Sequence, residues 1–195
     1  MKGTLKAVVF DAGETLVDET GLWQRAADLA GVPRFTVMGI LGGLITRGER
    51  HSRVWELLGV QRPDSMFEPG EFYPDALPCL AGLRACGLRV GVVGNTPEEF
   101  EDVIREHADF VGSSVRWGVE KPAPEFFERI VAEAGCAPAE VAYVGDRVDN
   151  DVVPALRAGL VAVHLRRGPW GYLHEAPPEA LRAHSLAEVP EVLGV

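Results

Sequence analysis

No stretch of about 18 consecutive apolar residues occurs in this chain, so we expect no transmembrane helix and no membrane partner. The apolar core of a secretory signal is also missing, because the chain enters a charged, strand-like segment at once. Cysteine is scarce, with only three residues, Cys79, Cys86 and Cys136. Their number is odd and their spacing does not suit a metal site. We therefore expect reduced thiols in a cytoplasmic protein.

Lysine is rarer still, with Lys2, Lys6 and Lys121 set against 16 arginines. Any chemistry that needs a lysine amine therefore has few candidates. The net charge is −10 and the basic residues are scattered, which argues against nucleic acid as the main partner. A phosphate ligand stays compatible with this charge, because a bound divalent cation can invert the local field.

The 195 residues, 47% of them hydrophobic, are enough for one sizeable core with a small insertion. After residue 73, short apolar segments alternate with segments of helical pattern. With the first strand, the strands are expected at 6–10, 88–93, 110–111, 141–144 and 160–164, and the helices at 76–85, 97–107, 124–134, 149–158 and 186–193. This alternation predicts an α/β fold with a doubly wound, Rossmann-like parallel sheet.

Residues 17–74 follow a different pattern, in which no strand is convincing. Apolar residues at helical spacing, interrupted by glycines, indicate three short helices. We expect a small α-helical unit inserted into a core formed by residues 1–16 and 75–195. Trp23 and Trp55 are expected to pack inside this unit, since large aromatic side chains usually serve packing.

Polar residues end three of the expected strands, namely Asp11, Asn95 and Asp146, and a further loop carries Lys121. The carboxyl ends of parallel strands share one edge of the sheet, so these groups can converge there. Taken alone, an aspartate such as Asp11 more often caps a turn or the next helix. Together, Asp11 and Asp146 suit a hard cation such as Mg²⁺, and Asp151, later in the same loop, could face or support it.

Four segments in this order resemble the haloacid dehalogenase superfamily of hydrolases, most of which are phosphatases. They are FDAGETL at 10–16, the turn at Asn95, GVEKPAPEFF at 118–127, and Gly145-Asp146 followed by Asp151. The resemblance covers residues 6 to about 167. It implies the α/β core of that superfamily, and the insertion at 17–74 resembles its small α-helical cap.

The resemblance also implies roles for single residues. Asp11 would be the nucleophile that forms an aspartyl-phosphate, and Lys121 would neutralise it and the phosphoryl oxygens. Asp146 would hold Mg²⁺ beside Asp11, with the backbone carbonyl of Gly13 as a further ligand. Asn95 would hold the phosphoryl group. Thr15 would brace the loop, and the substrate would be a small phosphorylated molecule.

Two departures from the family pattern concern catalysis. Gly13 stands where the phosphatases usually carry a second Asp that acts as general acid and base, a contribution typically worth about 10²–10⁴-fold. Glu14 is adjacent and could substitute, although neighbouring residues in a loop point differently. Gly94 stands where a Ser or Thr usually contacts the phosphate, and Thr96 is near.

Three functions therefore stay open. The first is Mg²⁺-dependent hydrolysis of phosphate esters, weakened or specialised by Gly13. The second is metal-independent dehalogenation of small haloacids, whose nucleophile loop also lacks the second Asp but carries a Tyr at the position of Gly13. The third is a non-catalytic binding or regulatory protein on the same scaffold, since fold does not fix function.

Overall fold

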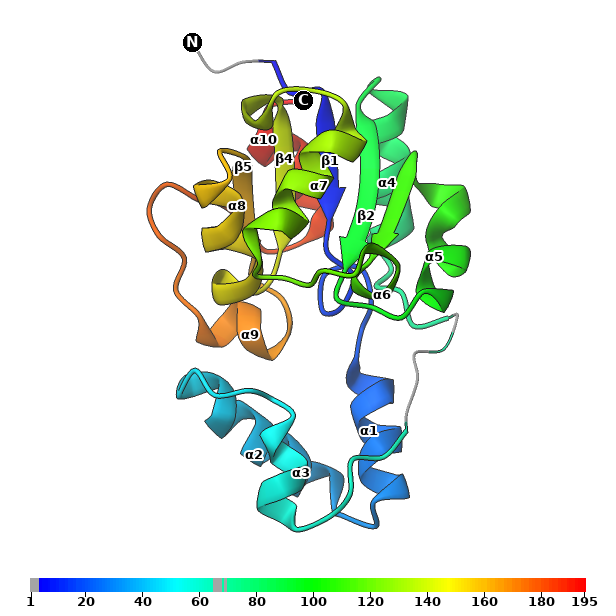
Figure 1. The fold of residues 1–195 in the computed structure, drawn as a ribbon, viewed down its shortest axis with the longest axis vertical. Helices are drawn as coiled ribbons and strands as arrows, with labels where there is room; N and C mark the ends of the chain where they lie inside the picture. The colour runs from blue at the N-terminus through cyan, green and yellow to red at the C-terminus, as the bar shows by residue number, and fades with distance from the viewer. Residues whose placement is uncertain (1–3, 65–67, 69) are drawn as a thin grey trace.

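The computed structural model describes residues 4–64, 68 and 70–195. A parallel sheet of six strands has the order β3-β2-β1-β4-β5-β6, the doubly wound arrangement expected from the sequence. The strands are β1 (Ala7–Phe10), β2 (Arg89–Gly94), β3 (Phe110–Ser113), β4 (Val141–Gly145), β5 (Val161–Leu165) and β6 (Leu181–Ala183). Their carboxyl ends point toward the helices α1–α3, at the bottom of Figure 1.

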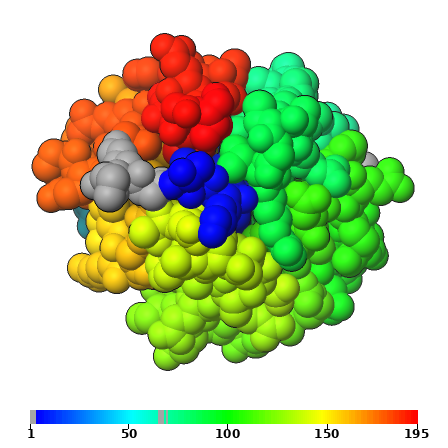
Figure 2. Space-filling model, turned by 90° about the horizontal axis from the view of Figure 1, so that it is seen from above, coloured from blue at the N-terminus to red at the C-terminus, as the bar shows by residue number. Residues whose placement is uncertain are grey.

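Helices cover both faces of the sheet because the strands at the centre of the sheet carry apolar side chains on both faces. On one face lie α4 (Ala76–Ala85), α5 (Glu99–Ile104) and α10 (Val189–Leu193), and on the other α7 (Pro124–Ala134) and α8 (Val153–Arg157). The β1 strand is fully buried in the middle of the sheet. Seen from the end opposite α1–α3, the blue start of the chain lies amid the other segments (Figure 2).

The segment between β1 and α4 forms the helices α1 (Thr20–Leu29), α2 (Arg34–Thr46) and α3 (Arg53–Leu58). Their apolar side chains form a cluster of their own, in which Trp23 stacks on Trp55 with ring centroids 6.1 Å apart. Trp170, from α9 (Gly168–Leu173), joins this cluster and so connects it to the core. We propose residues 17–74 as the cap; residues 65–67 and 69 lie outside the described part of the chain.

The chain crosses between core and cap twice, and the two crossings pair with each other. Val17 forms an antiparallel bridge with Phe72. The Asp18 N–H donates to the carbonyl of Glu71 at 2.8 Å, and the Tyr73 N–H donates to the carbonyl of Leu16 at 2.9 Å. The first residues of the cap are therefore fixed relative to the end of β1.

Several local expectations differ from the structure. The tail contains α9, the sixth strand β6 and a 3₁₀ turn at Leu186–Glu188 ahead of a shorter α10. The helix after β2 is shorter than the expected 97–107, because α5 begins only at Glu99 and is followed by a 3₁₀ turn at Arg105–His107. The helix expected at 149–158 starts with a π-helical turn at Val148–Val152, where Asp149 pairs with Arg147, and α8 begins only at Val153.

Among the described residues, no single helix is long and apolar enough to cross a membrane. Helices α1 and α2 reach the required length and composition only as a pair, and they are bent by 118° relative to each other. Both place apolar side chains in the cap cluster.

Two glycine substitutions should change stability in opposite directions. A Cβ on Gly112 in β3 would overlap the indole ring of Trp117 at the end of α6 (Ser114–Trp117), so Gly112→Ala should destabilise by about 1–3 kcal/mol through overpacking. A Cβ on Gly82, exposed in α4, meets nothing within 4 Å, so Gly82→Ala should stabilise by about 0.5–1 kcal/mol. Urea unfolding of both variants is the measurement, and shifts of the same sign would contradict this packing.

Candidate functional site

Asp11 follows β1 directly and lies at the carboxyl edge of the sheet. Its N–H donates to the carbonyl of Val144 in β4 at 2.9 Å, which continues the strand pairing by one residue. The residue is only 7% exposed. Because the strand order reverses between β1 and β4, Asp11 sits at the switch point, where doubly wound sheets bind their ligands.

Lys121 places its ammonium group between two carboxylates. Its Nζ atom lies 2.7 Å from Asp11 Oδ1 and 2.6 Å from Asp151 Oδ1, with all three side chains nearly or fully buried. Burial lowers the pKa of Lys121, but the charges of Asp11 and Asp151 outweigh it and raise the pKa above its ordinary value. Lys6 is tied to Glu140 at 2.7 Å, before the start of β1, and Lys2 lies outside the described residues.

Asn95, at the end of β2, holds the backbone of Lys121. The Lys121 N–H donates to Asn95 Oδ1 at 2.8 Å, and Asn95 Nδ2 donates to the Lys121 carbonyl at 3.0 Å. These two bonds fix the loop that carries the ammonium group. The structure thus gives Asn95 a positioning function, and its direct contact with a phosphoryl group stays a prediction.

Asp11, Asp146 and Asp151 form a buried cluster in which one carboxylate oxygen from each lies within 4.8 Å of the others. Within the described part of the chain, neither carboxylate oxygen of Asp146 has a hydrogen-bond partner. Burial, followed by the charges of Asp151 and Asp11, raises the pKa of Asp146 well above its usual range. One lysine cannot compensate three carboxylates, so the donor set fits a divalent cation that prefers oxygen ligands.

Three donors hold the carboxylate of Asp151, a residue expected only to face or support the cation. Its Oδ2 accepts from the Arg147 N–H at 3.0 Å, and its Oδ1 accepts from Tyr143 Oη at 3.4 Å in addition to Lys121. A Cβ at Gly145 would lie 2.6 Å from the Cβ and Oδ2 atoms of Asp151. The glycine before Asp146 therefore leaves room for this carboxylate.

The loop after β1 is held through the carboxylate of Glu14 and the backbone carbonyl of Thr15. Glu14 has the positive φ of 52°, and its carboxylate accepts from Tyr73 Oη and from the Glu19 N–H, both at 2.9 Å. Burial raises its pKa. The Thr15 hydroxyl is buried without a partner among the described residues, whereas its carbonyl accepts from Arg167 Nη1 at 3.1 Å.

Glu19 is a site residue that the sequence motifs do not reveal. It is the N-cap residue of α1, half-buried, and its Oε2 accepts from Trp23 Nε1 at 3.3 Å. A Cβ built on Gly13 would overlap Glu19 Oε1 and lie 3.1 Å from its Cδ. Burial, aided by the charge of Glu14, raises the pKa of Glu19 to about 7. No spacing rule connects a helix cap to a glycine six positions earlier.

The Gly94 position is close to the carboxylate of Asp11. A Cβ there would lie 3.0 Å from Asp11 Oδ1 and 3.2 Å from the Cγ2 atom of Thr96. The Thr96 hydroxyl is buried and, among the described residues, has no hydrogen-bond partner. Thr96 therefore remains a candidate for the hydroxyl contact that Gly94 lacks.

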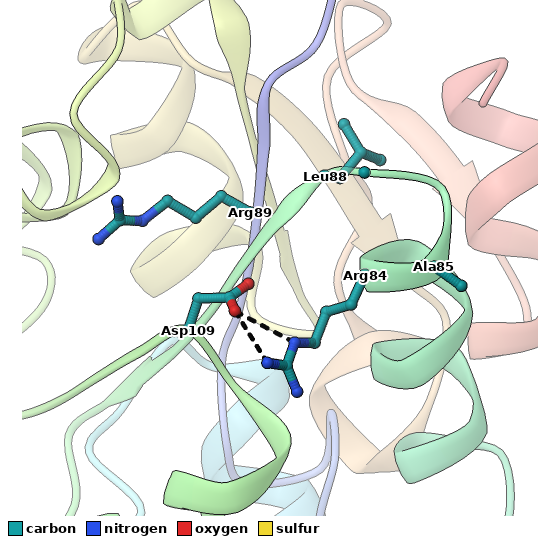
Figure 3. A pocket seen from close by; sticks show the side chains of 6 residues that line it. Arg84, Ala85, Leu88, Arg89 and Asp109 are labelled. Atoms are coloured by element: carbon teal, nitrogen blue, oxygen red, sulfur yellow. Dashed lines mark hydrogen bonds and ion pairs between the residues drawn. The ribbon is translucent and has the colours of Figure 1, made fainter.

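A hollow lies at the opposite end of the sheet. Figure 3 shows its lining by Arg84, Arg89 and Asp109, with Arg84 paired to Asp109 at 3.0 Å. Asp109 also accepts from the Val90 N–H at 2.8 Å, and the Arg89 guanidinium stacks over Phe110. These groups are satisfied by one another, and their place at the amino end of β2 separates them from Asp11.

Charge substitutions at the aspartate cluster should move stability in opposite directions when divalent cations are removed with EDTA. Lys121→Met should cost about 3–5 kcal/mol, because it leaves Asp11 and Asp151 buried without a counter-ion. Since the raised pKa of Asp146 means that its ionised form opposes folding at neutral pH, Asp146→Asn should stabilise by about 1 kcal/mol. Urea unfolding at pH 7.5 tests both, and a destabilised Asp146→Asn would contradict the charge argument.

Comparison with known proteins agrees with this geometry. A family model described as haloacid dehalogenase-like hydrolase matches residues 5–159. The glyceraldehyde 3-phosphate phosphatase of Methanopyrus kandleri is 41% identical over 113 residues, which are 55% of this chain and 48% of that protein. The chain thus spans about half the length of this curated relative.

Solved structures share the fold over nearly the whole chain. A HAD phosphatase from Thermococcus onnurineus has a TM-score of 0.66 at 22% identity, covering 97% of this chain and 98% of its own. The L-2-haloacid dehalogenase from Xanthobacter autotrophicus has a TM-score of 0.68 at 20% identity, covering 98% and 99%. These likenesses show the fold and do not choose between the two chemistries. With the family model matching most of its length, the chain belongs to the haloacid dehalogenase-like hydrolases.

Proposed function

We propose that this hydrolase cleaves phosphate monoesters in a Mg²⁺-dependent reaction that proceeds through an aspartyl-phosphate on Asp11. The observation that carries the proposal is the buried carboxylate of Asp146, which finds no partner in the described chain and lies beside the Asp11–Lys121 pair. A buried charge without a partner costs several kcal/mol, by rough estimate, unless something else compensates it. A divalent cation would supply that compensation.

Asp11, Asp146 and the Gly13 carbonyl would hold Mg²⁺, with Asp151 close enough to support it. Bound there, Mg²⁺ supplies positive charge for the phosphoryl oxygens of the substrate. The burial of the three carboxylates keeps water away from their remaining lone pairs. Removing the cation should therefore impair both binding and chemistry.

In the proposed reaction, Asp11 reacts with the substrate and the residues around it neutralise charge or position one another. The Asp11 carboxylate attacks phosphorus, and the P–O bond to the leaving group breaks; water then hydrolyses the aspartyl-phosphate. Lys121 neutralises charge on Asp11 and on the phosphoryl group, and Asn95 keeps Lys121 in place through its two backbone bonds. Asp151 orients the ammonium group from its other side.

The two other functions explain less of the structure. A metal-independent dehalogenase has no need of the partnerless Asp146, and Gly13 lacks the Tyr side chain of that subgroup. A binding protein would gain nothing from holding a buried lysine between two carboxylates, which is an expensive arrangement to fold. Both alternatives are outcomes of the experiment below.

We propose that the leaving group of the substrate enters a cavity between cap and core, which borders the loop after Asp11 at Glu14. It measures about 190 Å³ and is lined mainly by Glu14, Asp18, Trp23, Tyr73 and Trp170. This volume suits a leaving group of a few carbon atoms. The Methanopyrus kandleri relative is named for a triose phosphate, a molecule of that size. We propose a small phosphorylated metabolite and a cytoplasmic location, with neither nucleic acid nor membrane as a partner.

Turnover of 4-nitrophenyl phosphate with and without Mg²⁺ tests the proposed reaction. We expect Mg²⁺-dependent release of nitrophenolate that falls by about 10³-fold or more in Asp11→Asn, because the covalent step is lost. Asp146→Asn should also lose the rise in melting temperature that Mg²⁺ gives the wild type. Asp28→Asn, an exposed change on α1, is the matched control with unchanged turnover.

Equal turnover by pure wild type and Asp11→Asn would rule the phosphatase out. Turnover of 2-chloropropionate at a rate unchanged by EDTA would then favour the dehalogenase. Inactivity toward both substrate classes would favour a binding protein.

The cavity size makes a second prediction about kcat/KM. Glyceraldehyde 3-phosphate should be hydrolysed at least about tenfold more efficiently than a hexose 6-phosphate, because the larger alcohol exceeds the space between cap and core. Trp170→Ala, which removes a wall of the cavity, should narrow this ratio. A wild-type preference for the hexose phosphate would contradict the assigned cavity.

A further inference from the structure

The carboxyl group of Glu19 occupies the space in which the side chain of residue 13 would lie. A Cβ built on Gly13 overlaps Glu19 Oε1, and the next nearest atoms are Cδ and Cγ of the same side chain, at 3.1 and 3.8 Å. All three nearest atoms therefore belong to Glu19. The space beside Gly13 is filled by the carboxyl group of Glu19, which comes from the N-terminus of α1.

Contacts from α1 and the β1 loop fix the orientation of this carboxyl group. Glu19 Oε2 accepts from Trp23 Nε1 at 3.3 Å, one helical turn further along α1. The Glu19 N–H donates to Glu14 Oε1 at 2.9 Å. Trp23 itself is buried in the cap cluster and stacked on Trp55, so it cannot swing freely. The oxygen that faces Gly13 is Oε1, which carries no hydrogen bond among the described residues.

The neighbouring acid, Glu14, is committed elsewhere. One of its oxygens accepts from the Glu19 N–H and the other from Tyr73 Oη, so both are bound to protein groups. A Cβ on Gly168 would overlap its carboxyl group, which shows that α9 closes over it. Glu14 therefore serves to hold the crossing between core and cap.

We propose that Glu19 is the proton donor and acceptor of the reaction, in place of the aspartate that Gly13 lacks. The inference rests on the proposed phosphatase function and deepens it. When Asp11 attacks phosphorus, the bonding electrons of the P–O bond leave with the substrate oxygen, which takes the proton of the Glu19 carboxylic acid. Glu19 carboxylate then takes a proton from the water that attacks the aspartyl-phosphate, which releases inorganic phosphate and restores both residues.

The dependence of rate on the leaving group tests this assignment with Glu19→Gln, which keeps the shape of the side chain. On propyl phosphate, a poor leaving group, kcat should fall by about 10²-fold or more. On 4-nitrophenyl phosphate, the first step needs no acid but the second still lacks its base. We therefore expect a burst of one nitrophenolate per active site followed by slow turnover, a signature that a structural defect would not produce.

A transplanted acid provides a second, independent test. Glu19→Ala should lose the propyl phosphate activity, and Gly13→Asp combined with Glu19→Ala should regain at least about tenfold of it, because the new side chain enters the space that Glu19 vacates. Gly13→Asp alone should be weaker than the combination, since two side chains then compete for one space. Asp28→Asn, at the other end of α1, controls for loss of charge on this helix.

Two outcomes overturn the proposal while the phosphatase stands. One is a Glu19→Gln enzyme that loses less than about threefold on propyl phosphate and shows no burst. The other is the same leaving-group signature in Glu14→Gln instead. A wild type without turnover of either ester would overturn the proposed function and this inference together. If Glu19→Gln fails to fold, absence of rescue in the combined variant decides against the proposal.

Discussion

The ammonium group of Lys121 is buried between Asp11 and Asp151, and the surrounding residues serve to keep it there. A charge placed so deep is stable only with well-placed partners. Asn95 holds the backbone of the lysine through two hydrogen bonds, and Gly145 leaves the space that Asp151 fills. The sheet order provides the rest, because it brings the ends of β1, β2 and β4 to one edge.

This arrangement leaves negative charge in excess, and the repulsion between the carboxylates lowers the stability of the fold. Asp146 adds a third carboxylate to the cluster, and in the described chain no donor reaches either of its oxygens. A fold selected for stability alone would replace such a group by a neutral one. The proposed reaction gives a reason for this excess. A bound cation would compensate the carboxylates and would then also face the negative charge of the phosphoryl group.

The sequence predicts the parts of this site that depend on strand ends. Asp11, Asn95 and Asp146 each follow a buried apolar segment, and parallel strands bring such ends together. The function of Asn95 is less predictable, because the pairing of its amide with the Lys121 backbone depends on how a distant loop folds back. The strand β6 has only three residues and a polar centre, so alternation gives no signal for it. Glu19 is hidden for a similar reason, since its position relative to Gly13 is created by the cap crossing.

An acid on the first residue before α1 is placed differently from one on the β1 loop. An aspartate at residue 13 would be fixed by the strand that carries Asp11, whereas Glu19 depends on the crossing between core and cap. That crossing is held by the bridge of Val17 to Phe72 and by Glu14, which binds both Tyr73 and the Glu19 backbone. Proton transfer would thus require the cap connections to be paired. The buried carboxylate of Glu14, on a residue with a positive φ, joins Glu19 and Tyr73 to the loop that follows β1.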